Sequence, residues 1–238
     1  MNAIVILSGG LDSSVVAYQV KKEYKKIKCI FFDYSQRTKE QEEFAARQIS
    51  KKIGAEFIKV NLPWLGEIST SLINTKKKIN KTTEKDLENI QKEKEDIVNW
   101  WIPCRNSLFI NIALAYAESE YISKKEIYDI FIGIKDEGKI AMKDTTPEFL
   151  NIMNRMQEHA TNDGIYKIKA PLIDKDKPET VDIGNKLKVS FELTYSCYKG
   201  EPIKNGKLVH CGYCSNCMQR KKAFHFAGIN DPSKYKSI

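Results

Sequence analysis

The chain alternates between short apolar runs that are typical of buried strands and longer apolar or amphipathic stretches that are typical of helices. Strands are expected over residues 4–7, 28–34, 56–62, 127–133 and 168–171. Helices are expected after Leu11 and over residues 38–54, 105–121, 147–160 and 177–189. This alternation predicts an α/β fold, a doubly wound parallel sheet with helices on both faces.

The helix over residues 38–54 carries signals at both of its ends. Thr38 is its expected N-cap, Gln41 follows three residues later, and Gly54 is its expected C-cap. Elsewhere, Ser8, Tyr34 and Gly133 fall at the ends of expected strands. Because ligands of parallel sheets bind beyond the carboxyl ends of the strands, we expect the loops that follow them to converge on one site.

Residues 75–99 break the pattern, because they are highly charged and have few apolar positions. We expect a mobile surface insertion with some helix. Its position before Trp100 suits a lid over the site, and a plain surface loop fits equally well.

Composition narrows the picture. The chain has 238 residues, 42% of them hydrophobic, which is enough for one large α/β domain or for a domain with a small appendage. No apolar run reaches the roughly 18 residues of a membrane span, and the start leaves no room for a signal peptide, so a cytoplasmic protein is expected. The net charge of +8 comes largely from lysine runs that suit solvated surfaces, and no direct contact with nucleic acid is expected.

The first strand ends in the string Ser8-Gly9-Gly10-Leu11-Asp12-Ser13-Ser14. The two glycines let backbone N–H groups approach an anion, and the serines add hydroxyl donors where a helix dipole favours phosphate. The string matches neither G-x-x-x-x-G-K-[ST] nor G-x-G-x-x-G, the commonest phosphate loops. An ordinary strand-to-helix turn is the alternative.

Four of the six cysteines gather near the C-terminus, at Cys197, Cys211, Cys214 and Cys217. Two overlapping C-x-x-C steps and four thiolates suit a closed, structural zinc site. An iron–sulfur cluster is the alternative, and His210 could replace one ligand, although Cys197 completes the set.

The other two cysteines are expected to be packing residues. Cys29 lies inside an apolar strand, where a core position is expected. Cys104 stands in a turn before a helix, where a packed small residue is favoured over a catalytic thiol.

The glycine-rich string resembles the pyrophosphate loop of the N-type ATP pyrophosphatases. Together with the cysteine cluster, it makes nearly the whole chain similar to the 7-cyano-7-deazaguanine synthase family. Further matching segments are 34–37, 103–106, 194–200, 211–221 and 227–232. The resemblance implies an adenine nucleotide alpha hydrolase-like, Rossmann-like domain over 1–190, with the insertion at 75–99, and a zinc-binding region over 191–238.

The resemblance also implies a reaction, that of an AMP-forming ligase. The carboxylate of 7-carboxy-7-deazaguanine attacks the α-phosphate of ATP, and ammonia displaces AMP to give an amide. A second ATP activates the amide oxygen, and loss of AMP leaves a nitrile. ATP, Mg²⁺ and Zn²⁺ are the implied cofactors, and a homodimer is the implied assembly.

The same resemblance distributes roles among residues. For ATP it implies the loop and one arginine, namely Ser8, Gly9, Gly10, Leu11, Asp12, Ser13, Ser14 and Arg37. For the deazaguanine acid it implies Tyr34, Gln36, Arg105, Asn106 and Asp144, and for catalysis Asp12, Ser13 and Arg105. For Lys177, at a helix start, a solvated lysine is favoured over a phosphate contact.

The chain departs from the family around the expected substrate. Residues 141–149 stand where the family has G-Y-P-D-C-R-P-E-F and retain only Asp144 and the segment 147–149, while Thr38 replaces a histidine and Cys104 a glycine. These changes leave a second hypothesis open, a paralogue that stops at the amide or joins the acid to another amine, including one on a partner protein. Two others are tRNA thiolation with Cys104 and Cys197 as the sulfur-carrying pair, and a non-catalytic binding module with a relict loop.

Overall fold

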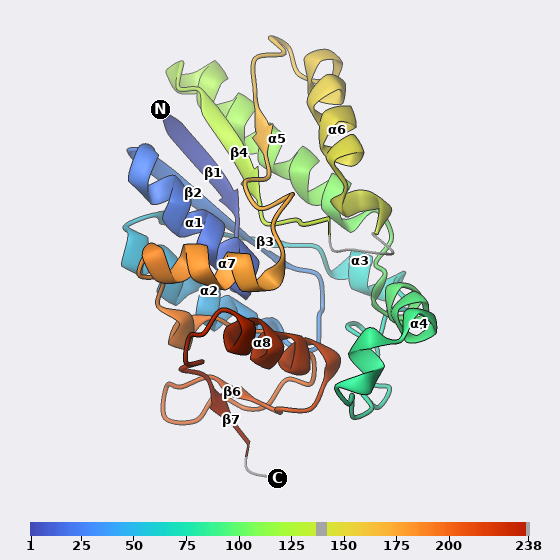
Figure 1. Ribbon diagram of the computed structural model, residues 1–238. Coiled ribbons are helices and arrows are strands. Elements are labelled where there is room, and N and C mark those ends of the chain that lie inside the picture. Colours follow the sequence, from blue (N-terminus) through green and yellow to red (C-terminus); the bar gives the residue numbers. More distant parts are fainter. Residues whose placement is uncertain (137–141, 237–238) are drawn as a thin grey trace.

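The computed structural model describes residues 1–136 and 142–236. Its centre is a five-stranded parallel sheet with the strand order β3-β2-β1-β4-β5 (Figure 1). The strands are β1 (Asn2–Ile6), β2 (Lys26–Asp33), β3 (Glu56–Asn61), β4 (Tyr128–Ile132) and β5 (Ile168–Lys169). The expected doubly wound α/β fold is confirmed.

The helices connect the strands and extend beyond them. They are α1 (Leu11–Glu23), α2 (Lys39–Ile53), α3 (Pro63–Glu67), α4 (Ile90–Trp100), α5 (Arg105–Lys124), α6 (Pro147–Ala160), α7 (Lys177–Lys186) and α8 (Ser215–Phe226). Single 3-10 turns lie at Lys85–Glu88, Lys143–Thr145 and Phe191–Leu193, and the strands β6 (Val209–His210) and β7 (Lys234–Tyr235) pair with each other. Each strand and helix of the predicted pattern is present, whereas α3, α8, β6 and β7 were not predicted. In the part of the chain that the structure describes, none of these helices has the length and apolar character that crossing a membrane requires.

The sheet has a separate hydrophobic core on each face. Side chains alternate along a strand, so Ala3 and Val5 of β1 face one core while Ile4 and Ile6 face the other. The first core packs residues of α1, α2, α7 and α8, and the second packs residues of α3, α5 and α6. Both faces are therefore covered, which explains why the strands read as continuous apolar runs.

The ends of α2 agree with the sequence prediction only in part. Gly54 adopts a left-handed conformation with φ of 68°, as a C-cap glycine should. Thr38 occupies the N-cap position, but its hydroxyl donates to the Glu42 carboxylate instead of capping the backbone. Gln41 donates to the Glu201 carbonyl, so the expected capping arrangement is wrong. A local side-chain contact of Thr38 and a tertiary contact of Gln41 replace it.

The strands β2 and β3 are added on one side of β1, whereas β4 and β5 are added on its other side. The strands β1 and β4 are therefore neighbours although two strands separate them in sequence. At this point Gly133, directly after β4, packs against the start of α1. A Cβ atom at residue 133 would lie 2.8 Å from the Ser13 backbone nitrogen, so only glycine allows this approach. The crevice beyond β1 and β4 is the position at which doubly wound sheets bind ligands.

The charged insertion and the C-terminal region both lie toward this end of the sheet (Figure 1). Arg37 holds the start of the insertion, because its guanidinium donates to the carbonyls of Leu72 and Lys77. The Trp100 and Tyr198 rings stack with centroids 4.1 Å apart, which joins α4 to the C-terminal region. The expected helix in the insertion is confirmed, since most of α4 lies within it.

Candidate functional site

The glycine-rich loop turns directly from β1 into α1. Gly9 has a φ of 78°, and Gly10 precedes the first residue of the helix. The Ser8 and Ser13 hydroxyls lie 3.0 Å apart, and Ser8 Oγ accepts the Gly10 N–H. Backbone and hydroxyl donors are thus collected at a helix N-terminus, which is a favourable position for a phosphate group.

A cavity of about 340 Å³ opens beside this loop, within the usual range for small-molecule sites. Five loop residues line it, namely Ser8, Gly10, Leu11, Asp12 and Ser13. Its other walls come from the loop after β2, from α2, α4, α5 and α7, and from the C-terminal region. They include Tyr34, Glu42, Trp100, Arg105, Lys177, Tyr195, Tyr198 and Arg220. The predicted convergence of the loops after Ser8, Tyr34 and Gly133 is confirmed, because all three residues line this cavity.

Two lysines lie next to the loop aspartate. Lys135, whose side chain is 2% exposed, places its Nζ 3.3 Å from Asp12 Oδ1. Lys177, at the start of α7, places its Nζ 3.9 Å from Asp12 Oδ2 and lines the cavity. The interpretation of Lys177 as a solvated lysine is therefore wrong, because the start of α7 packs beside the loop. Two ammonium groups beside the glycine-rich loop favour an anionic ligand.

Arg105, at the first position of α5, links several groups of the site. Burial raises the pKa of Tyr34, Glu42 and Asp144 above the ordinary values. The positive charge of Arg105 opposes this effect on all three groups but is the smaller of the two influences. The Arg105 Nε donates to Asn106 Oδ1, and Asn106 donates in turn to the Asp144 carbonyl. A second cavity of about 170 Å³ adjoins here. It shares Tyr34, Glu42 and Arg105 with the first cavity and is lined by Asn106 in addition.

Not all predicted residues line the two cavities. Gly9, Ser14, Gln36, Arg37 and Asp144 are absent from the walls of both among the described residues. Gln36 is buried and donates to the Phe32 carbonyl and to Glu42, and Arg37 holds backbone carbonyls of the insertion. In the segment 141–149, Ala141 lies outside the described residues.

Cys104 is exposed, so the interpretation of this residue as a packed small side chain is wrong. It adopts a left-handed conformation with a φ of 51°, immediately before α5 begins. That backbone conformation favours glycine, which is the residue that the resembled family carries at this position. With cysteine in place of that glycine, the chain still makes the left-handed turn that glycine would make without strain.

The four clustered cysteines are buried, and their sulfur atoms all lie within 4.8 Å of one another. A tetrahedral zinc site with Zn–S bonds of about 2.3 Å separates its sulfurs by about 3.8 Å, and Cys211 Sγ lies 3.9 Å from Cys217 Sγ. The cluster therefore fits a metal ion held by four thiolates. His210 is not part of it, because the four clustered ligand atoms are all cysteine sulfurs and the His210 Nε2 accepts the Ser196 N–H.

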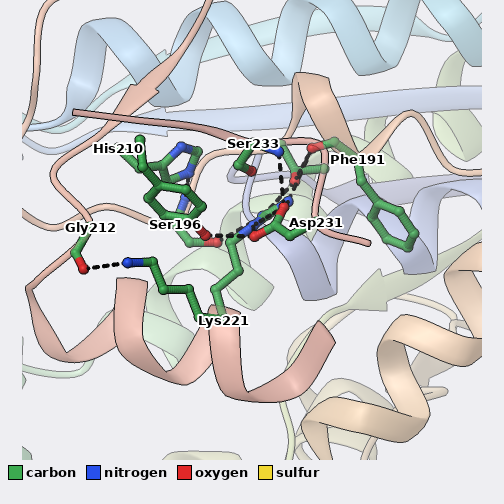
Figure 2. Close-up of polar contacts among 10 residues, drawn as sticks. Phe191, Ser196, His210, Gly212, Lys221, Asp231 and Ser233 are labelled. Atoms are coloured by element: carbon green, nitrogen blue, oxygen red, sulfur yellow. Dashed lines mark hydrogen bonds and ion pairs between the residues drawn. The ribbon is translucent and has the colours of Figure 1, made fainter. Parts of the chain in front are cut away.

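A buried arginine ties the C-terminal tail to the cavity wall. Its partners Phe191, Ser196 and Asp231 lie close together in Figure 2. Arg220 of α8 is 1% exposed, and its Nε lies 3.1 Å from the Asp231 carboxylate. Its remaining N–H groups donate to Thr194 Oγ1, Ser196 Oγ and the Phe191 carbonyl. Sequence reasoning missed this residue, although the motifs 211–221 and 227–232 contain both partners of the pair.

Replacing Arg220 with methionine should lower the free energy of unfolding by about 3–5 kcal/mol, because the mostly buried Asp231 carboxylate loses its cationic partner. Burial raises the pKa of Asp231, and Arg220 and Tyr235 together lower it below its usual range. The stabilisation is therefore present above the ordinary aspartate pKa and is lost as the pH falls through the lowered value.

Urea denaturation at neutral pH measures this effect. The matched control is Lys186→Met, which removes a pair with Asp182 whose lysine side chain is 73% exposed and should change stability little. Equal effects of the two substitutions would contradict the assigned role of Arg220.

Comparison with known proteins gives the family. The family model described as "Queuosine biosynthesis protein QueC" matches residues 2–228. The chain belongs to the QueC family. A QueC relative from Methanobrevibacter smithii, named 7-cyano-7-deazaguanine synthase, is 38% identical over 233 residues, 98% of this chain and 97% of the relative. A relative of the same name from Methanocaldococcus jannaschii is 38% identical over 241 residues and covers 99% of both chains.

The similarity of this QueC member to solved structures is weaker than its similarity to these relatives. A 4-thiouridine synthetase–RNA complex with bound ATP matches with a TM-score of 0.47 and 14% identity, over 95% of this chain and 50% of that chain. A predicted subunit of a tRNA methyltransferase from Methanocaldococcus jannaschii matches with a TM-score of 0.44 and 15% identity, over 100% of this chain and 92% of that chain. Likeness at this level carries no conclusion about function.

Proposed function

We propose that this QueC protein is an ATP-dependent, AMP-forming ligase that converts 7-carboxy-7-deazaguanine and ammonia to 7-cyano-7-deazaguanine through an amide. The observation that carries the proposal is the full-length match to relatives named for this product, in a chain whose glycine-rich loop lines a cavity. The homodimer and the cytoplasmic location stay predictions.

The loop and its surroundings suit the first chemical step. The substrate carboxylate oxygen forms a bond to the α-phosphorus of ATP, and pyrophosphate leaves. Negative charge grows on the departing group, and preorganised donors at that position lower the barrier. The donors here are the backbone at the start of α1, the Ser8 and Ser13 hydroxyls and the Lys177 ammonium. Ammonia then displaces AMP from the acyl carbon and loses a proton, which gives the amide.

The second activation uses the same donors. The amide oxygen attacks a second ATP, and pyrophosphate leaves again. Loss of AMP and of two N–H protons then leaves the nitrile. One site can serve both rounds, because each places negative charge on an α-phosphate and on pyrophosphate.

The two implied metals fit the chain differently. Zn²⁺ suits the cysteine cluster, where it would be structural because four thiolates leave no open position. For Mg²⁺, Asp12 is the carboxylate that the glycine-rich loop places on the cavity wall, and Lys135 already compensates part of its charge. Magnesium bound mainly through the phosphates of ATP is therefore expected, where it would neutralise charge on them.

The alternative functions find less support. Thiolation with Cys104 and Cys197 would need Cys197 outside the cluster, but its sulfur lies within the four-thiol group. A relict loop is disfavoured by the intact string Ser8–Ser14 and by its position on the cavity wall.

Mass spectrometry after incubation with ATP, Mg²⁺, ammonium and the deazaguanine acid tests the proposal. We expect the nitrile, with two AMP and two pyrophosphate molecules for each nitrile formed. Amide as the only product would instead indicate a paralogue with a different end point. The absence of AMP with this acid would refute the proposed substrate.

A further inference from the structure

Glu42 of α2 lines both cavities, and the pyrophosphate-loop chemistry does not use it. Its carboxylate is held in place by the Thr38 hydroxyl on Oε1 and by Gln36 Nε2, 3.0 Å away, on Oε2. A carboxylate oxygen can accept two hydrogen bonds, so each oxygen keeps acceptor capacity after these contacts. Glu42 is therefore a fixed acceptor on the wall of the site.

Burial raises the pKa of Glu42, against the opposing effects of Thr38, Gln36 and Arg105. A carboxylate removed from water is costly unless hydrogen-bond donors replace the water. A ligand that brings two N–H groups to this position would supply those donors. The site thus favours a ligand with neighbouring donors.

Arg105 lines the same two cavities, and its guanidinium group carries N–H donors. The pair therefore offers donors from Arg105 next to acceptors from Glu42. The pyrimidinone edge of a deazaguanine has the complementary order, a carbonyl oxygen followed by a ring N–H and a 2-amino group. The adenine edge has one amino donor and one ring acceptor, so it cannot present two donors to the carboxylate.

We propose that Glu42 is the specificity-determining residue that accepts hydrogen bonds from the ring N–H and the 2-amino group of the deazaguanine acid, while Arg105 donates to its carbonyl oxygen. This inference rests on the proposed function and deepens it. The stacked Trp100 and Tyr198 rings line the larger cavity and supply aromatic surface for a planar bicyclic ring. Asp144, to which the family resemblance gives a substrate role, lines neither cavity.

The test is steady-state kinetics of pyrophosphate release by the full-length protein. Glu42→Gln exchanges one acceptor oxygen for a donor and should raise the KM for the deazaguanine acid by roughly 10- to 100-fold. The KM for ATP should stay within about twofold, because adenine does not use this contact. Glu42→Asp, which retains the charge, should recover part of the loss.

A substrate analogue gives a readout that a purely structural role would not change. The wild-type protein should discriminate strongly against the same acid without its 2-amino group. Glu42→Gln should lose most of that discrimination, because the contact that detects the amino group is gone.

The matched control is Glu43→Gln on the same helix, where the carboxylate pairs with Lys59 and Arg47 instead of facing the cavity. It should leave both KM values unchanged, and thermal unfolding checks that every variant is folded. The inference is overturned if Glu42→Gln keeps the wild-type KM for the acid, if it raises the KM for ATP instead, or if Asp144→Asn alone weakens acid binding. Wild-type protein that releases no pyrophosphate with the acid would remove the proposed function itself, which separates the two failures.

Discussion

Replacing Gly9 with alanine is expected to reduce ATP-dependent pyrophosphate release by at least about 100-fold, the loss that misplaced catalytic groups typically cause. Gly9 has a φ of +78°, and its Cβ would lie 2.6 Å from the Glu42 carbonyl oxygen and 2.7 Å from the Ala45 Cβ. The rigid backbone of α2 cannot yield by that much. The loop must therefore move, and its N–H and hydroxyl donors move with it.

The chain offers a matched control for this substitution. Gly206 has a φ of +69°, but an added Cβ would meet nothing within 4 Å. Gly206→Ala therefore carries the same left-handed strain, about 1–2 kcal/mol, without the steric clash. Pyrophosphate release should be near the wild-type rate in this control. Similar rates for the two variants would contradict the assignment of the loop as the nucleotide site.

Loss of the metal is expected to have the second large effect. Cys211→Ser should abolish stoichiometric zinc binding and lower the free energy of unfolding by more than about 4 kcal/mol, as loss of a structural metal does. The effect should reach the active site as well. Tyr195, two residues before the first cluster cysteine, donates its N–H to the Gly9 carbonyl at 2.8 Å and lines the cavity. Loosening the cluster therefore loosens the loop.

Metal analysis by mass spectrometry and urea denaturation check this prediction on the same samples. Cys104→Ser is the matched control, because that thiol is exposed and stands outside the cluster. It should retain the metal and the wild-type stability. A Cys211→Ser protein with full zinc content and unchanged stability would exclude the structural role of the cluster.

The sequence by itself determined the fold class and two features of the site. Apolar runs and amphipathic stretches alternate clearly enough to predict the sheet and its helices, because burial of both faces of a parallel sheet leaves a strong pattern. The glycine-rich string and the C-x-x-C steps are local, so their geometry follows from neighbouring residues. The helix α8 was missed because its apolar positions are few and the cysteines dominate its start.

Only the tertiary structure decided which side chains share the cavity. Glu42, Lys135 and Arg220 are charged residues whose local sequence resembles a solvated surface. Each nevertheless interacts with a group distant in the chain, namely Arg105, Asp12 and Thr194 respectively. Thr38 and Gln41 fit a capping pattern, but Thr38 bonds the Glu42 side chain one turn along the helix and Gln41 bonds the distant Glu201 carbonyl. A local pattern reports which surfaces a segment must bury, whereas the partner of a buried charge depends on how the strands are ordered. That order, β3-β2-β1-β4-β5, brings the loop, α2, α5 and the C-terminal region to one crevice.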